Sequence, residues 1–141
     1  MVEEAKIQEV VSLKHANVLL ISREKTLIIE ATSDFIPFAH FQHIFQEAGT
    51  IVKREGITKL IFDKRSLKVF DPQSMEWYFT QWKEEMFTHG LVSHRKVMPK
   101  NQLFKYSVDT SRRQIFEKYP KSKFHQMDIR YASSLEEAIA E

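Results

Sequence analysis

The amino-acid sequence predicts a single α/β domain with a mostly parallel five-stranded sheet, an antiparallel N-terminal hairpin and helices on both faces. The first observation is that short apolar runs alternate with segments whose apolar residues recur every three or four positions. The second is size, because 141 residues favour one domain. The third is composition, since 43% apolar residues and eleven Phe suit a packed core. Strands separated by helices imply right-handed crossovers between parallel strands.

The N-terminal part of the chain contains the predicted hairpin. Residues 1–16 alternate weakly in polarity and indicate either a lead-in or a short edge strand. Two β-rich runs follow at residues 17–22 and 26–31, and the three residues between them are the spacing of a hairpin. We therefore expect these strands to be antiparallel and to open an α/β domain that spans residues 17–141.

The middle of the chain predicts a helix, a buried strand and a second helix. The first helix, residues 37–55, begins at a proline and is closed by Gly56. Residues 59–63 form a continuous apolar strand, as expected in a sheet that is covered on both faces. The second helix has Asp71 as its N-cap and Pro72 at its first position. The predicted core stripes of the two helices are Phe38, Phe41, Phe45, Ala48 and Val52, and then Met75, Phe79, Trp82 and Met86.

The C-terminal part continues the alternation of strands and helices. A strand at residues 95–98 is ended by Pro99, and Asn101 is placed to cap a third helix that ends before Pro120. The core-facing residues of that helix are Phe104, Val108, Ile115 and Tyr119. A last strand lies near residues 127–131. Two overlapping capping boxes then open a C-terminal helix, Ser133 with Glu136 and Ser134 with Glu137.

Scarce residue types exclude several functions. The chain has three Gly, too few for a glycine-rich phosphate cradle. It has no Cys, which excludes disulfides, a thiol nucleophile and cysteine-bound metal. No segment approaches the roughly 18 apolar residues of a membrane span, and no signal sequence is seen, so we expect a cytoplasmic protein that is not transmembrane. His40, His43 and Glu47 share a helix face opposite the apolar stripe, which favours a solvated surface over a metal site.

The charge of the chain is unevenly distributed. Residues 93–125 contain nine Lys or Arg but only two acids, Asp109 and Glu117. Such a segment can attract nucleic acid, a membrane surface or an anionic ligand. We favour a solvated face of one helix and the ends of two strands. No nucleic acid is expected, because aromatic residues that would stack on bases are not interleaved with these charges.

Charged and aromatic residues follow the predicted strand at 59–63. Asp63 could act as a base or metal ligand, but a lone carboxylate there more often accepts hydrogen bonds from its own loop. Lys64 and Arg65 could bind an anion with help from nearby helix N-termini, or could be solvated loop charges. Trp77 lies opposite the core stripe of its helix, where it could line a pocket, enter a dimer contact or pack under the preceding loop. With Lys100, these residues form the candidate binding site at the carboxyl ends of the strands.

The chain resembles the SpoIIAA-like or STAS-like domains, most of all their small stand-alone bacterial members. The resemblance is in the order of elements, in K-L-I-F-D at 59–63, D-P-Q-S-M-E-W at 71–77, the strand that ends at Met98 and Pro99, and I-R-Y-A-S-S-L-E-E-A at 129–138. It covers residues 17–141. It implies a non-enzymatic domain that binds partner proteins, sits on transporters or holds small ligands.

The resemblance also bears on phosphorylation. Members that act as phosphorylation switches carry Asp-Ser-Ser-Gly or Asp-Ser-Thr-Gly at the start of the helix after the third strand. Asp71 corresponds to the Asp, but Pro72 and Gln73 stand at the two hydroxyl positions and cannot be phosphorylated. Ser74, at the glycine position, and Ser66 are weaker acceptors, and Ser74 is better suited to bonding the free N–H groups of the first helical turn.

The resulting expectation is a non-catalytic, STAS-like binding module without catalytic residues, metal or cofactor. Its partner would be an unidentified protein or a small anionic or apolar ligand, and a homodimer is one form it could take. One alternative is a signalling protein like the anti-sigma-factor antagonists, regulated at Ser66 or Ser74. Another is a carrier of an anionic or lipid-like ligand with a pocket at the carboxyl ends of the strands. An enzyme with Asp63 as base would need a second titratable group nearby, which the sequence does not supply.

Overall fold

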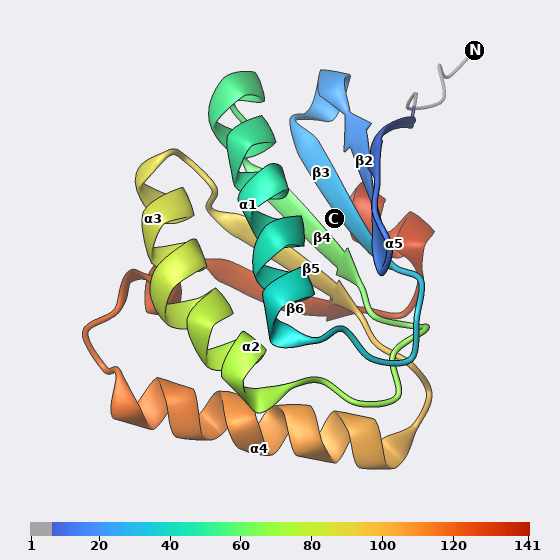
Figure 1. Cartoon of the computed structure of the whole chain (residues 1–141). Helices are drawn as coiled ribbons and strands as arrows, with labels where there is room; N and C mark the ends of the chain where they lie inside the picture. Colours follow the sequence, from blue (N-terminus) through green and yellow to red (C-terminus); the bar gives the residue numbers. More distant parts are fainter. Residues whose placement is uncertain (1–6) are drawn as a thin grey trace.

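The computed structural model describes residues 7–141, and its centre is a mixed sheet whose six strands lie side by side in chain order (Figure 1). Strands β1 to β3 form an antiparallel meander, and β3 to β6 are parallel. The strands are β1 (Gln8–Ser12), β2 (Ala16–Ile21), β3 (Thr26–Ala31), β4 (Lys59–Asp63), β5 (Ser93–Val97) and β6 (Asp128–Ala132). The sheet thus has one strand more than the five predicted, because β1 pairs with β2 as the short edge strand that was one alternative for residues 1–16. The remainder of the predicted lead-in, residues 1–6, lies outside the described residues.

The helices cover the two faces of the sheet unequally. The parallel strands lie in the sheet in the same order as in the chain, and right-handed crossovers join them. Every connecting helix therefore lies on the same face of the sheet. That face carries α1 (Phe38–Glu55), α2 (Pro72–Trp77), α3 (Lys83–Thr88) and α4 (Gln102–Lys118), as Figure 1 shows. The short C-terminal helix α5 (Leu135–Ala140) packs behind β4, β5 and β6. Helices therefore lie on both faces as predicted. No helix of the described chain combines the length and apolar character needed to cross a membrane.

Residues alternate along the central strands between the two faces. In β4, Leu60 and Phe62 join the large core under the crossover helices, whereas Ile61 joins a smaller core against α5. Both sets of side chains are buried, which is why this strand is a continuous apolar run. The core stripe predicted for the second helix, Met75, Phe79, Trp82 and Met86, is confirmed as buried.

The second predicted helix contains an irregularity. Between α2 and α3 the backbone forms a π-helical segment, Tyr78–Trp82. A π-turn widens the helix, so residues that an α-helical wheel would separate can face the same side. Both Tyr78 and Lys83 are therefore buried beside Phe79 and Trp82. Sequence periodicity alone did not predict this enlargement of the buried face.

The predicted helix caps are confirmed. Asp71 Oδ2 accepts hydrogen bonds from the backbone N–H of Ser74 at 3.0 Å and from its hydroxyl at 2.7 Å. Asn101 caps α4 in the same way, and the Ser134 hydroxyl accepts a bond from the Glu137 N–H at the start of α5. These side chains satisfy backbone donors that would otherwise lack partners.

Candidate functional site

Strand β5 carries charged residues into the interior. Its neighbours β4 and β6 and the helices on either side enclose it, so His94, Arg95 and Lys96 are only 1–2% exposed. Arg95 faces α5, where its guanidinium donates to Asp128 O at 2.9 Å, to Asp128 Oδ2 at 3.1 Å and to Glu141 O at 3.2 Å, while its Nε is buried without a hydrogen-bond partner among the described residues. His94 and Lys96 point the other way, towards the crossover helices. The prediction that the basic segment 93–125 is a solvated face is therefore wrong for these three residues.

Five basic side chains gather between β4, β5 and the helices, and we call them the buried basic cluster: Lys64, Lys83, His94, Lys96 and Arg112. Each of the three lysines is 1% exposed. Lys64 directly follows β4, and its backbone N–H bonds to Val97 O at 2.8 Å, which ties it to the end of β5. Lys83 comes from α3 and Arg112 from α4. Lys64 and Lys96 therefore lie towards the carboxyl ends of two adjacent parallel strands, whereas His94 is the second residue of β5.

Aromatic rings surround the lysine ammonium groups. Lys64 Nζ lies 5.0 Å from the ring centre of Phe62 and 4.8 Å from that of Phe70. Lys83 Nζ lies 3.7 Å from the ring centre of Phe79, and Lys96 Nζ lies 5.4 Å from the same ring. Such contacts stabilise a cation by about 1–2 kcal/mol, much less than the penalty for burying an unpaired charge.

The cluster lacks matching negative charge. Within residues 7–141, no hydrogen bond from Lys64 Nζ or Lys96 Nζ is seen, and the buried side-chain nitrogens without a hydrogen-bond partner are Arg95 Nε and Arg112 Nε. The pKa of Lys64 is lowered from 10.5 to about 7. Burial is the largest cause, and the positive charge of Arg112 lowers the pKa further, whereas the negative charge of Asp109 raises it. Burial likewise lowers the pKa of Lys83 and of Lys96 well below the ordinary value. Of the described carboxylates, only Asp109 favours the charged forms of Lys64 and Lys96.

Lys83 belongs to a buried hydrogen-bond chain with His94 and Tyr78. The Tyr78 hydroxyl lies 3.0 Å from His94 Nε2, and Lys83 Nζ lies 2.9 Å from His94 Nδ1. The Tyr78 hydroxyl has no other acceptor among the described side chains, so we assign it as the donor to Nε2. Neutral His94 then carries its proton on Nδ1 and donates to Lys83, which can accept only as a neutral amine. Burial, which lowers the pKa of both His94 and Lys83, favours the same assignment.

Tyr131 of β6 separates the cluster from the surface. Its ring centre lies 5.4 Å from Lys96 Nζ, its hydroxyl donates to Asp109 Oδ1 at 2.6 Å, and the side chain is 45% exposed. Burial, followed by the hydrogen bond to Asp109, raises the pKa of Tyr131 to about 12. The phenol is therefore a neutral group that covers Lys96 and is held by a hydrogen bond to α4.

Two surface hollows meet at Tyr131 and Asp109. The larger has a volume of about 620 Å³ and is also lined by Met98, Lys100 and Lys105. The smaller, of about 410 Å³, is lined by Arg112, Arg113 and Phe116. The Nε of Arg112 is buried without a hydrogen-bond partner in the part of the chain that the structure describes. A molecule in either hollow would lie against Tyr131 and directly outside the buried basic cluster.

The structure brings only some of the predicted site residues together. Lys64 lies in the cluster, and Lys100 lines the hollow outside it. Arg65 is instead engaged with Asp63: Arg65 Nε and Nη2 donate to the Asp63 carboxylate at 2.9 Å and 2.7 Å. Asp63 also accepts the Arg65 backbone N–H at 3.1 Å, the structural role that a lone carboxylate at a strand end favours.

The two serines considered for phosphorylation differ in exposure. Ser74 is fully buried and its hydroxyl donates to Asp71, whereas Ser66 is exposed in the loop after β4. Ser74 thus has the capping role that its position at the helix start suggests.

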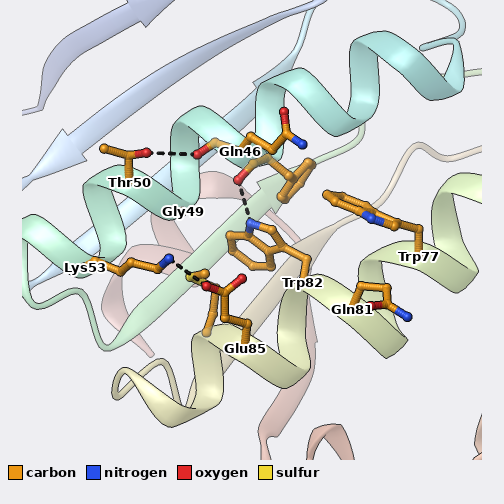
Figure 2. Close-up of a pocket in the computed structure, with 10 residues that line it drawn as sticks. Gln46, Gly49, Thr50, Lys53, Trp77, Gln81, Trp82 and Glu85 are labelled. Carbon is orange, nitrogen blue, oxygen red and sulfur yellow. Dashed lines mark hydrogen bonds and ion pairs between the residues drawn. The ribbon is translucent and has the colours of Figure 1, made fainter.

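Trp77 lies apart from the cluster, in a groove of about 310 Å³ between α1 and the α2–α3 segment (Figure 2). Its half-buried ring meets Phe38 and Phe41 of α1 edge-on. The same groove contains Gln46 and Gln81, and an ion pair between Lys53 and Glu85 at 2.6 Å crosses it. The predicted constellation of Lys64, Arg65, Trp77 and Lys100 is therefore divided among different places.

Sequence reasoning missed most of the buried basic cluster. The sequence pattern favours solvated positions for His94, Lys96 and Arg112 and does not single out Lys83. The available signal was only that S-H-R-K-V lies, in chain order, between two other strands of a mostly parallel sheet, a kind of sheet whose strands are commonly covered on both faces. Comparisons with protein-family models, with curated proteins and with solved structures found no match to this chain.

Proposed function

We propose that the protein is a non-catalytic binding module of the STAS-like kind, and that its ligand is a small anion held at the carboxyl ends of β4, β5 and β6. The observation that supports this most strongly is the presence of two fully buried lysines, Lys64 and Lys96, that converge without a hydrogen-bond acceptor among the described residues. Arg112 adds a third cationic group beside them.

The energetics favour a role in binding over a role in stability. An isolated buried ammonium costs several kcal/mol, and proteins normally pair such groups or replace them by apolar residues. Here one carboxylate, Asp109, faces several basic groups, and its oxygen already accepts the Tyr131 hydroxyl. An anion among the lysines would supply the missing charge and hydrogen-bond acceptors. The free-energy cost of burying these lysines would then be offset when the ligand binds.

The surroundings suggest how a ligand would lie. Its anionic group would reach past Tyr131 to Lys96, Lys64 and Arg112, and the rest of the molecule would occupy the larger hollow beside Met98 and Lys100. Ligands of α/β sheets commonly bind at this edge, outside the carboxyl ends of parallel strands. The resemblance to STAS-like domains supports a binding role but does not specify the ligand.

Calorimetric titration tests the proposal. Phosphate, pyrophosphate and citrate would be titrated into the protein at pH 7 and low salt. We expect at least one of them to bind, and Lys96→Met or Lys64→Met to raise its Kd by at least tenfold, about 1.4 kcal/mol. Lys53→Met is the matched control, because Lys53 pairs with Glu85 in the separate Trp77 groove and should leave the Kd unchanged. If none of the anions binds, or the cluster variants bind as well as the control, the proposal is wrong.

A further inference from the structure

We propose that Lys96 captures the carbonyl group of an anionic aldehyde or ketone as a reversible imine. This rests on the proposed anion site and specifies its ligand: a small molecule with both a carbonyl group and a carboxylate or phosphate. The inference starts from the position of Lys96, which is 1% exposed and whose Nζ lies 5.4 Å from the ring centres of both Phe79 and Tyr131.

A nucleophilic amine must be unprotonated, and two features of this site provide that state. Apolar rings desolvate Lys96, and basic groups of the cluster approach it: Lys64 from β4, Lys83 from α3 and Arg112 from α4. A lysine that is desolvated beside other cationic groups is the arrangement that activates an amine for attack on a carbonyl. Asp109 on α4 is the acidic group that opposes this effect among the described residues.

The neighbouring groups divide the remaining tasks. Arg112 and Lys64 are placed to bind the carboxylate or phosphate, which would orient the carbonyl carbon towards Lys96 Nζ. The Tyr131 ring lies 5.4 Å from Lys96 Nζ, and its hydroxyl donates its one proton to Asp109 at 2.6 Å; it would donate to the carbonyl oxygen by exchanging Asp109 for that acceptor. Lys83 is already engaged with His94 at 2.9 Å, whereas Lys96 lies beside Tyr131, which lines both hollows.

The reaction is balanced without any oxidant or reductant. The nitrogen lone pair of Lys96 forms the C–N bond, and the carbonyl oxygen takes up a proton as the amine loses one, which gives a carbinolamine. The hydroxyl then leaves as water with a second proton, while the nitrogen gives up its remaining proton and the C=N bond forms. One amine and one carbonyl yield one imine and one water, and water reverses the reaction.

Trapping with borohydride tests this proposal on the wild-type protein. Pyridoxal 5′-phosphate is the anionic carbonyl probe, and pyridoxal, which lacks the phosphate, is its matched control. Each is incubated with the protein at pH 7, reduced with cyanoborohydride and mapped by peptide mass spectrometry. We expect one pyridoxyl phosphate group per chain, on Lys96, and at least tenfold less label on Lys96 with pyridoxal. Lys96→Met should remove this label, and Lys53→Met should retain it.

The outcomes separate this inference from the proposed function. Label confined to exposed lysines such as Lys100, or equal labelling of Lys96 by both probes, would overturn the inference. If pyridoxal 5′-phosphate competes with pyrophosphate but leaves Lys96 unlabelled, the imine is wrong and the anion site stands. If pyridoxal 5′-phosphate does not bind and none of phosphate, pyrophosphate and citrate binds either, both proposals fail. Because the map of the wild-type protein locates the label by itself, the test does not depend on the folding of a variant.

Discussion

Lys64 illustrates at the scale of a single residue what burial does to a charged side chain. Its pKa falls from 10.5 to about 7, so the folded protein binds fewer protons than the unfolded chain between these two values. Stability must then rise with pH across that interval, by about 1.4 kcal/mol per pH unit for one such group. Below pH 7 the penalty for burying Lys64 is fully present and no longer changes.

The first prediction concerns Lys64→Met. Methionine fills a similar volume without the amine, so the variant should be more stable than the wild type by about 1–4 kcal/mol at pH 7. The difference should shrink as the pH rises to 9.5, because the wild-type amine then costs less to bury. Urea unfolding at pH 7, 8, 9 and 9.5 measures it. Parallel pH profiles for the two proteins would show that Lys64 is not buried as an amine with a lowered pKa.

The second prediction concerns the chain of Tyr78, His94 and Lys83. Tyr78→Phe removes the donor to His94 Nε2 and leaves a buried nitrogen without a partner. The free energy of unfolding should fall by about 1–3 kcal/mol. Tyr106→Phe is the control, because Tyr106 is 72% exposed and should change stability very little. Equal effects of the two substitutions in urea unfolding would contradict the assigned chain.

At the scale of secondary-structure elements, the strongest local signals predicted the fold well. Asp71, Asn101 and Ser134 were recognised as helix caps because a cap depends on residues within one turn. The apolar stripe of the second helix was predicted because its spacing is regular over several turns. The π-turn at Tyr78–Trp82 was not, since it depends on how the helix packs and not on a local pattern.

The packing of that π-turn against α1 gives the third prediction. A Cβ at Gly49 would lie 3.2 Å from Met86 Cε and 3.2 Å from Trp82 Nε1. Met86 is flexible, but the Trp82 indole is fixed by its hydrogen bond of 2.5 Å to Phe45 O. Gly49→Ala should therefore destabilise the protein by about 1 kcal/mol, although alanine is normally the better helix former. Thr50→Ala, on the exposed side of the same turn, should be neutral or stabilising.

Urea unfolding of both variants decides this prediction. If Gly49→Ala raised the free energy of unfolding as helix propensity alone requires, the contact between Trp82 and α1 would be less tight than described. The result matters for the site, because the π-turn that positions Trp82 against α1 also places Lys83 beside His94.

At the scale of the whole molecule, the strand order decides where charge is buried. The sequence predicted the alternation of strands and helices, because each element carries its own periodicity. It did not predict that β5 would lie between β4 and β6, with Lys96 covered by Tyr131. Lysine and histidine in a short strand are normally expected to face solvent. They are buried here because helices and neighbouring strands cover β5 on both faces. Lys64 was found because it ends a strand, but its burial could not be inferred locally.

The same topology explains why Arg65 and Trp77 do not join the site. Successive residues at the end of β4 point to different sides, so Lys64 enters the layer under the helices while the exposed Arg65 pairs with the buried carboxylate of Asp63. Trp77 comes from the side of α2 that faces α1. Proximity in the sequence therefore misled the prediction of one joint pocket.

Proton-linked calorimetry tests most directly the central claim that an anion completes the buried basic cluster. The anion that binds in the titration series would be measured at pH 8 in buffers with different ionisation enthalpies. Because the bound anion raises the pKa of the lysines that face it, binding should take up roughly one proton per site. The heat of binding should therefore depend on the buffer for the wild type. This dependence should be lost in the double variant that carries both Lys64→Met and Lys96→Met. Binding without proton uptake, or proton uptake that persists in the double variant, would contradict the claim.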